Sequence, residues 1–101
     1  DAAFYAACHG LLAPGGVMTV NLFGRDASFE RSAARVAAAF GADQVWQMVP
    51  TKEGNTVLVG GREVVVPDRE TLTARAEAIE ARYGLPARKW LRMVRPYRPA
   101  D

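Results

Sequence analysis

Cys8 and His9 are adjacent and are the only cysteine and the only histidine in the chain. A thiol and an imidazole would suggest a nucleophile and its base, but neighbouring residues on a helix point about 100° apart. The two side chains therefore cannot form a catalytic pair, and together they are too few for a closed zinc site. We expect no catalytic residue and no metal site, with Cys8 a small core residue on the helical stripe Phe4, Ala7, Cys8 and Leu11.

The carboxyl-terminal region is basic. Residues 82–101 hold six basic and one acidic side chain, a net charge of +5, whereas residues 1–81 hold seven basic and ten acidic, a net charge of −3. Trp90 and Tyr97 are interleaved with these cations, a pattern that could bind phosphates through charge and bases through stacking. Short arginine-rich termini are more often solvated or packed on their own protein, so we do not expect nucleic-acid binding.

The glycine pairs Gly15-Gly16 and Gly60-Gly61 are isolated, and no G-x-G-x-G pattern occurs. A phosphate-binding loop needs several closely spaced glycines before a helix. We interpret both pairs as turn or bulge residues.

The composition is that of a folded globular domain: 101 residues, half of them hydrophobic and 24% charged. One cysteine permits no internal disulfide, and no apolar stretch approaches the roughly 18–20 residues that span a bilayer. We expect a soluble, cytoplasmic protein with no membrane partner.

Hydrophobic spacing predicts alternating helices and strands. Residues 2–12 read as a helix, 17–23 as a buried strand and 27–40 as an amphipathic helix with Phe29, Ala33, Val36, Ala37 and Phe40 on one face. Short strands at 45–49 and 56–59 flank a polar segment with Gly54-Asn55 as turn residues, and they predict a hairpin. Gly60-Gly61 then interrupts the second strand before 63–66, which either extends it past a bulge or forms a separate piece.

A third helix begins at Pro67-Asp68, with Asp68 as its N-cap, and ends at Gly84. Its expected apolar face is Leu72, Ala76, Ile79 and Tyr83. Residues 87–94 predict one more short helix before Pro96 and Pro99 end the ordered chain.

These elements predict an α/β fold with a small three-stranded mixed sheet, containing one antiparallel hairpin and flanked by helices. The helix at 27–40 should cross over one face of the sheet. We expect residues 1–101 to form a single domain with a basic tail at 85–101. Strand 17–23 or its neighbour should lie at an open, apolar edge, which natural domains usually cover.

The run from Phe4-Tyr5 through Leu11-Leu12-Ala13-Pro14-Gly15-Gly16-Val17, followed by Thr19-Val20-Asn21-Leu22-Phe23, resembles the later part of class I methyltransferase-fold proteins. The spermidine and spermine synthases, the polyamine aminopropyltransferases, are the most similar members, because Gly84 to Arg88 also resembles their Gly-Leu-Pro-Ala-Arg segment. The resemblance implies the C-terminal half of a Rossmann-like fold. It makes 17–23, 44–50 and 55–61 the last three strands, the final one antiparallel and inserted between the others.

The same resemblance implies what a whole protein would do: transfer an aminopropyl group from decarboxylated S-adenosylmethionine to a polyamine. The family's glycine-rich loop and strand-end aspartate would lie before residue 2, so the chain alone should be an inactive fragment without a cofactor. It should need the missing N-terminal part of the domain and should form homo-oligomers, such as a dimer, through its open edge.

Open α/β sheets bind ligands beyond the carboxyl ends of their strands, which makes Asn21, Phe23 and Gly24 the candidate substrate-binding residues. Two alternatives remain for these positions, a structural hydrogen bond for Asn21 and a core role for Phe23. Two alternatives also remain for the function: an S-adenosylmethionine-dependent methyltransferase fragment, or a stand-alone α/β interaction module whose basic tail binds protein or nucleic acid.

Overall fold

The computed structural model describes residues 1–23 and 27–99, which divide into two compact units. The first unit comprises residues 1–64 together with the C-terminal residues from Arg95 onward, and the second comprises Val65–Val94.

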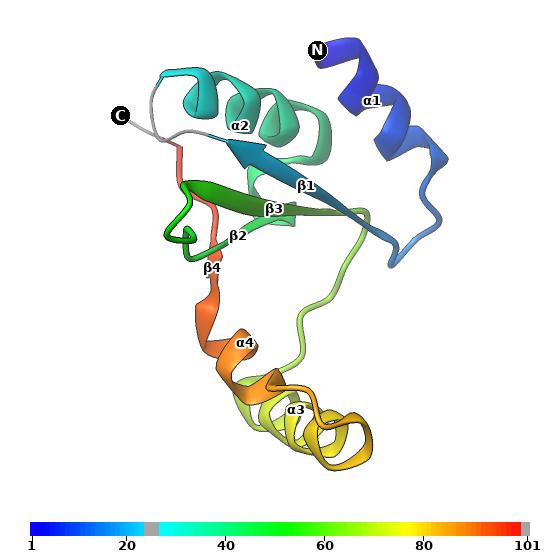
Figure 1. The fold of residues 1–101 in the computed structure, drawn as a ribbon. Helices are drawn as coiled ribbons and strands as arrows, with labels where there is room; N and C mark the ends of the chain where they lie inside the picture. Colours follow the sequence, from blue (N-terminus) through cyan, green and yellow to red (C-terminus); the bar gives the residue numbers. More distant parts are fainter. Residues whose placement is uncertain (24–26, 100–101) are drawn as a thin grey trace. The chain divides into compact units, whose positions relative to one another are not determined.

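The first unit contains two helices, a short 3₁₀ turn and the sheet (Figure 1). In chain order its elements are α1 (Ala2–Leu11), β1 (Val17–Phe23), α2 (Ala27–Phe40), η1 (Ala42–Gln44), β2 (Val45–Met48) and β3 (Asn55–Gly61), followed by β4 (Val94–Pro96), which begins at the last residue of the second unit. The predicted helix at 27–40 is confirmed, and Gly41, at φ 91°, follows its last residue in a conformation that favours glycine.

The sheet has four strands in the order β1-β3-β2-β4. β3 is antiparallel to both neighbours: Val17 lies opposite Gly61 and Phe23 opposite Asn55 on one side, and Val45 lies opposite Gly60 on the other. β1 and β2 therefore run in the same direction without touching, with β3 inserted between them. β1 lies at an edge of the sheet, as expected. The prediction that it is buried was wrong, because its residues alternate between exposed and half-buried.

The prediction of three strands was wrong, because the region after Met93 adds a fourth. Instead of losing order at Pro96, the chain extends beside β2, and the Tyr97 N–H donates to the Val45 carbonyl at 2.9 Å. A proline is tolerated there because an edge strand leaves some backbone groups without sheet partners. The prediction of a mixed sheet was also wrong, because β3 pairs antiparallel with both β1 and β2.

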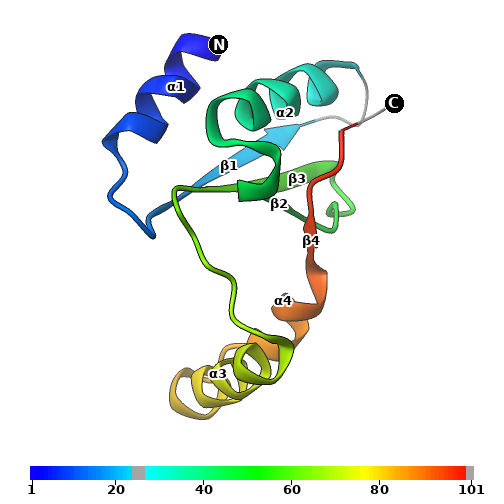
Figure 2. The same ribbon diagram turned by 180° about the vertical axis from the view of Figure 1, so that it is seen from behind.

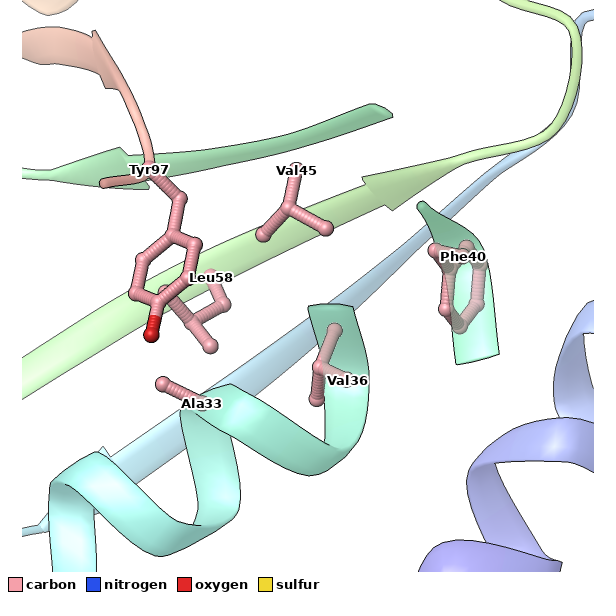
Figure 3. Packing of buried hydrophobic residues seen from close by; sticks show 6 residues of the cluster. All are labelled: Ala33, Val36, Phe40, Val45, Leu58 and Tyr97. Carbon is pink, nitrogen blue, oxygen red and sulfur yellow. The ribbon is translucent and has the colours of Figure 1, made fainter. Parts of the chain in front are cut away.

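The core of the first unit lies between α2 and the sheet (Figure 3). Val36 and Leu58 have no exposed surface. The predicted stripe of α2 is confirmed, with three residues buried and Phe29 and Ala37 packed at the margin. The buried cluster consists of Ala33, Val36, Phe40, Val45, Leu58 and Tyr97.

α1 turns a different face to the core from the one predicted. Tyr5 and Leu12 pack against the buried cluster, whereas Phe4 is 60% and Leu11 87% exposed. The helix is apolar on nearly every side, so periodicity alone could not distinguish the covered stripe from the next one. Figures 1 and 2 show α1 beside α2, which leaves the outer stripe of α1 uncovered within the first unit.

β3 passes without interruption through Gly60-Gly61, so the predicted break at these glycines was wrong. The chain needs glycine at position 60 because the Phe40 ring lies against its backbone. Residues 63–66 form neither an extension of β3 nor a strand of their own.

The second unit is a pair of helices, α3 (Arg69–Tyr83) and α4 (Ala87–Met93). The predicted start of α3 is confirmed, since the Asp68 carboxylate accepts the Thr71 N–H at 2.8 Å. Gly84, at φ 69°, ends it. The predicted apolar face is only partly covered: Ala76 is buried, but Tyr83 is 62% exposed, because seven-residue α4 cannot cover fifteen-residue α3.

Candidate functional site

The carboxyl end of β1 meets the amino end of β3 at one edge of the first unit. This follows from the antiparallel register, in which Phe23, the last residue of β1, lies opposite Asn55, the first residue of β3. Asn21 lies opposite Val57, next along the same face. Residues from two strands separated by more than thirty positions therefore share one end of the sheet.

Asn21 and Phe23 point to the face of the sheet away from α2. Met18 and Leu22 pack against the core, and side chains alternate along a strand, so Asn21 and Phe23 lie on the opposite side. We call this side the open face, because within the described residues of the first unit both packed helices lie on the other side. Phe23 is 71% exposed, which contradicts the alternative of a core role.

The structure thus brings together two of the three sequence-predicted site residues, Asn21 and Phe23. Gly24, the third, lies outside the described residues. Asn21, like Phe23, is exposed on this side of the sheet.

Asn55 joins this end of the open face and was missed by sequence reasoning, which treated Gly54-Asn55 only as turn chemistry. The turn is well formed: Thr51 Oγ1 accepts the Asn55 N–H at 3.1 Å, and the Thr51 N–H donates to the Asn55 carbonyl at 2.9 Å. The side-chain Oδ1 of Asn55 is nevertheless buried, with no hydrogen-bond partner among the described residues. The sequence signal was the strand pairing, because an antiparallel β3 must begin where β1 ends.

Cys8 and His9 lie in different surroundings. The His9 ring packs edge-on against Phe40, with centroids 5.0 Å apart, and Cys8 is half-buried rather than fully in the core. The Arg62 guanidinium binds the carbonyl oxygens of His9 and Gly10 at the end of α1, where a cation is favourable. Across residues 1–23 and 27–99, no group of three or more His, Cys, Asp or Glu side chains could hold a metal ion.

The glycine pairs are structural. Gly15, at φ 84°, lies in the turn before β1, where its N–H donates to the Arg62 carbonyl and Gly16 accepts the Arg62 N–H. The pair at 60–61 lies within β3. The turn interpretation is confirmed for the first pair, whereas the second is a site of close packing.

The two aromatic residues of the basic tail differ in exposure. Trp90 is 43% exposed, whereas Tyr97 is a core residue with only 5% exposure, so its ring is not available to stack on a base. Burial, with a smaller contribution from the negative charge of Glu30, raises the pKa of Tyr97 above its ordinary value.

Part of the tail's charge is used within the second unit. Glu80 Oε1 accepts the Arg88 N–H at 2.7 Å, and its Oε2 pairs with Arg88 Nε at 2.9 Å. The backbone hydrogen bond from Arg88 is the main cause that lowers the pKa of Glu80, and the charges of Arg88 and Arg92 contribute. Glu80 thereby caps the first turn of α4. A shallow depression here is lined by Glu77, Glu80, Ala81 and Arg88.

The edge of the first unit formed by α1 and β1 has an unusual surface. Residues 2–24 contain no Asp, Glu, Lys or Arg, although nearly a quarter of the whole chain is charged. Besides the exposed residues of α1, Val17 is 53% exposed on β1. An uncharged edge strand beside an exposed apolar helix is typical of an interface.

No protein-family model, no curated protein and no solved structure matches this chain. In the described residues, none of the helices has the length and apolar character needed to cross a bilayer.

Proposed function

We propose that this chain is the C-terminal portion of a class I methyltransferase-like domain of the polyamine aminopropyltransferase type. In this proposal the chain supplies the acceptor side of the site, at the carboxyl end of β1. The whole protein transfers an aminopropyl group from decarboxylated S-adenosylmethionine to a polyamine.

The observation that carries the proposal is the position of β3. A strand that follows β2 in a hairpin would most simply pair with the outer edge of β2, on the side away from β1. Here β3 returns between β1 and β2, antiparallel to both. This is the arrangement that the resemblance to the last three strands of the methyltransferase fold implies, and the register supports it over the full length of β1.

The surface of the first unit supports the proposal independently. A strand edge without charge and an apolar outer stripe on α1 are stable when another segment pairs with β1 and packs on α1. The missing N-terminal part of the domain would provide that segment.

The residues of this chain do not fit the donor. The glycine pairs are used in a turn and in packing against Phe40, which leaves no glycine-rich loop to approach a nucleoside. We therefore assign no donor-binding step to this chain. Its contribution is to hold the amine in line with the donor, and positioning of this kind supplies much of the rate in group transfer.

Isothermal titration calorimetry tests this division of roles. Decarboxylated S-adenosylmethionine and S-adenosylmethionine, titrated separately into the 101-residue chain, should give no heat of binding. Binding of either donor to this chain alone would contradict the proposal. The product of the complete reading frame should bind the decarboxylated donor, and preference for S-adenosylmethionine would favour the methyltransferase alternative.

A further inference from the structure

The Asn55 side chain carries a cost that the fold does not explain. Its Oδ1 has almost no solvent-accessible surface and accepts no hydrogen bond from residues 1–23 or 27–99. A buried acceptor without a donor destabilises a folded chain, and native proteins retain few of them. The backbone of Asn55 already completes the turn with Thr51, so the amide oxygen is not needed to close it.

Two side chains of β1 lie near the Asn55 amide on the same face of the sheet. Phe23 lies directly opposite Asn55, and Asn21 lies two residues earlier on the same face of β1. Facing side chains on adjacent strands have Cβ atoms about 5 Å apart, and diagonal neighbours are about 7–8 Å apart. Two amide oxygens and one aromatic ring therefore lie within the span of a small ligand.

We propose that Asn55, Phe23 and Asn21 form a subsite for an alkylammonium group, with Asn55 Oδ1 as its buried hydrogen-bond acceptor. An ammonium group offers N–H donors and no acceptor, which suits an oxygen that lacks a donor. Its charge is also attracted to the face of an aromatic ring. The proposal rests on the proposed function only for the identity of the ligand, a polyamine.

Phe23 can adjust its ring to a bound ligand. Because the ring is 71% exposed, a rotamer change loses few contacts. In this proposal the ring lies over the ammonium group, while Asn21 accepts a second N–H from the open face.

The test is a nuclear magnetic resonance titration of the 101-residue chain with spermidine, with 1,8-octanediol as an uncharged probe of similar length. Spermidine should shift the side-chain amide signals of Asn21 and Asn55 and the ring signals of Phe23, and the diol should not. The same shifts with the diol, or none with spermidine, would overturn the proposal.

Variants of Asn55 separate a ligand-binding role from a structural one. Asn55→Leu, nearly isosteric, should abolish the spermidine shifts and raise Tm by about 4 °C or more, since it removes the unsatisfied oxygen. Asn55→Asp should strengthen spermidine binding about two- to fivefold through the added charge. Thr19→Val, farther along the same face, should leave binding unchanged. A lower Tm for Asn55→Leu, or unchanged binding in either Asn55 variant, would overturn the proposal.

This experiment does not measure transfer, so its failure is distinct from failure of the proposed function. Aminopropyl transfer by the whole protein without the spermidine shifts would retain the function and reject the subsite. Spermidine shifts without transfer would retain the subsite and reject the function.

Discussion

The Phe40 ring occupies the space in which a side chain at Gly60 would begin: a Cβ built on Gly60 comes within 2.9 Å of the Phe40 Cδ2. This contact joins the last residue of α2 to the middle strand of the sheet. It lets the helix approach β3 closely at that end, and it explains why a strand interior contains a residue that usually weakens strands.

Gly60→Ala should therefore destabilise the chain by about 1–3 kcal/mol, because the ring and strand must separate. Gly10→Ala is the matched control: its added methyl group meets nothing within 4 Å and lies in a helix, so it should stabilise by about 0.5–1 kcal/mol. Urea unfolding monitored by circular dichroism measures both. Equal stability of the Gly60→Ala variant and the wild type would refute this packing constraint.

Tyr97 should make the chain sensitive to alkali. Burial raises its pKa in the folded state above the ordinary 10.0, so its contribution to stability is complete below pH 10.0 and is lost as the pH rises through the folded-state pKa. The free energy of unfolding, measured with urea, should fall less for Tyr97→Phe than for the wild type between about pH 8 and about pH 11, a range that brackets the ordinary tyrosine pKa.

The spectrophotometric difference between wild type and Tyr97→Phe should titrate with a midpoint above pH 10.0. Glu30→Gln should move that midpoint down, since it removes a negative charge that disfavours the phenolate. A midpoint at or below 10.0 would show that Tyr97 is not held in the core.

Glu80 should make α4 sensitive to acid. Its pKa is lowered in the folded state, so its stabilising contribution is present above the ordinary 4.5 and is lost as the pH falls through the lower folded-state pKa. Hydrogen exchange at the Arg88 amide should accelerate, relative to its intrinsic rate, as Glu80 becomes protonated.

Glu80→Ala should remove this protection of the Arg88 amide at neutral pH, whereas Glu77→Ala, one turn earlier on α3, should retain it. Protection that persists in Glu80→Ala would mean that the carboxylate does not cap α4.

The uncharged edge of β1 should cause the isolated chain to self-associate. Thr19→Lys places a charge on this exposed edge strand and should reduce association, because a lysine opposes edge-to-edge pairing. Ala38→Lys adds the same charge on the exposed surface of α2 and should not. Light scattering across a concentration series measures the effect, and a wild-type chain that stays monomeric at high concentration would contradict the expectation.

Local patterns were sufficient for most helices and failed where one pattern fitted two faces. α2 was predictable because polar residues lie on both sides of its apolar stripe. α3 was predictable because Asp68 and Gly84 mark its ends. α1 was assigned the wrong stripe, because Phe4 and Tyr5 are equally hydrophobic candidates on neighbouring faces. β4 was missed because its strand signal is three residues long and contains Pro96, and only the free edge of β2 makes it a strand.

The candidate site shows the same division. Asn21 and Phe23 could be proposed from their position at the end of a predicted strand. Asn55 could not be identified from its place in a turn, because its significance depends on pairing with a strand more than thirty residues away and on an oxygen left without a donor among the described residues. Such non-local facts appear only once the register is known.

The most direct measurement is aminopropyl transfer by the product of the complete reading frame that encodes these residues, with decarboxylated S-adenosylmethionine and a polyamine. The account predicts transfer that Asn21→Ala reduces about tenfold or more in kcat/KM, through loss of a hydrogen bond to a charged group. Thr19→Ala, on the same face but farther from the strand end, should stay near the wild-type value. Absence of aminopropyl transfer, or an equal effect of the two variants, would contradict the account.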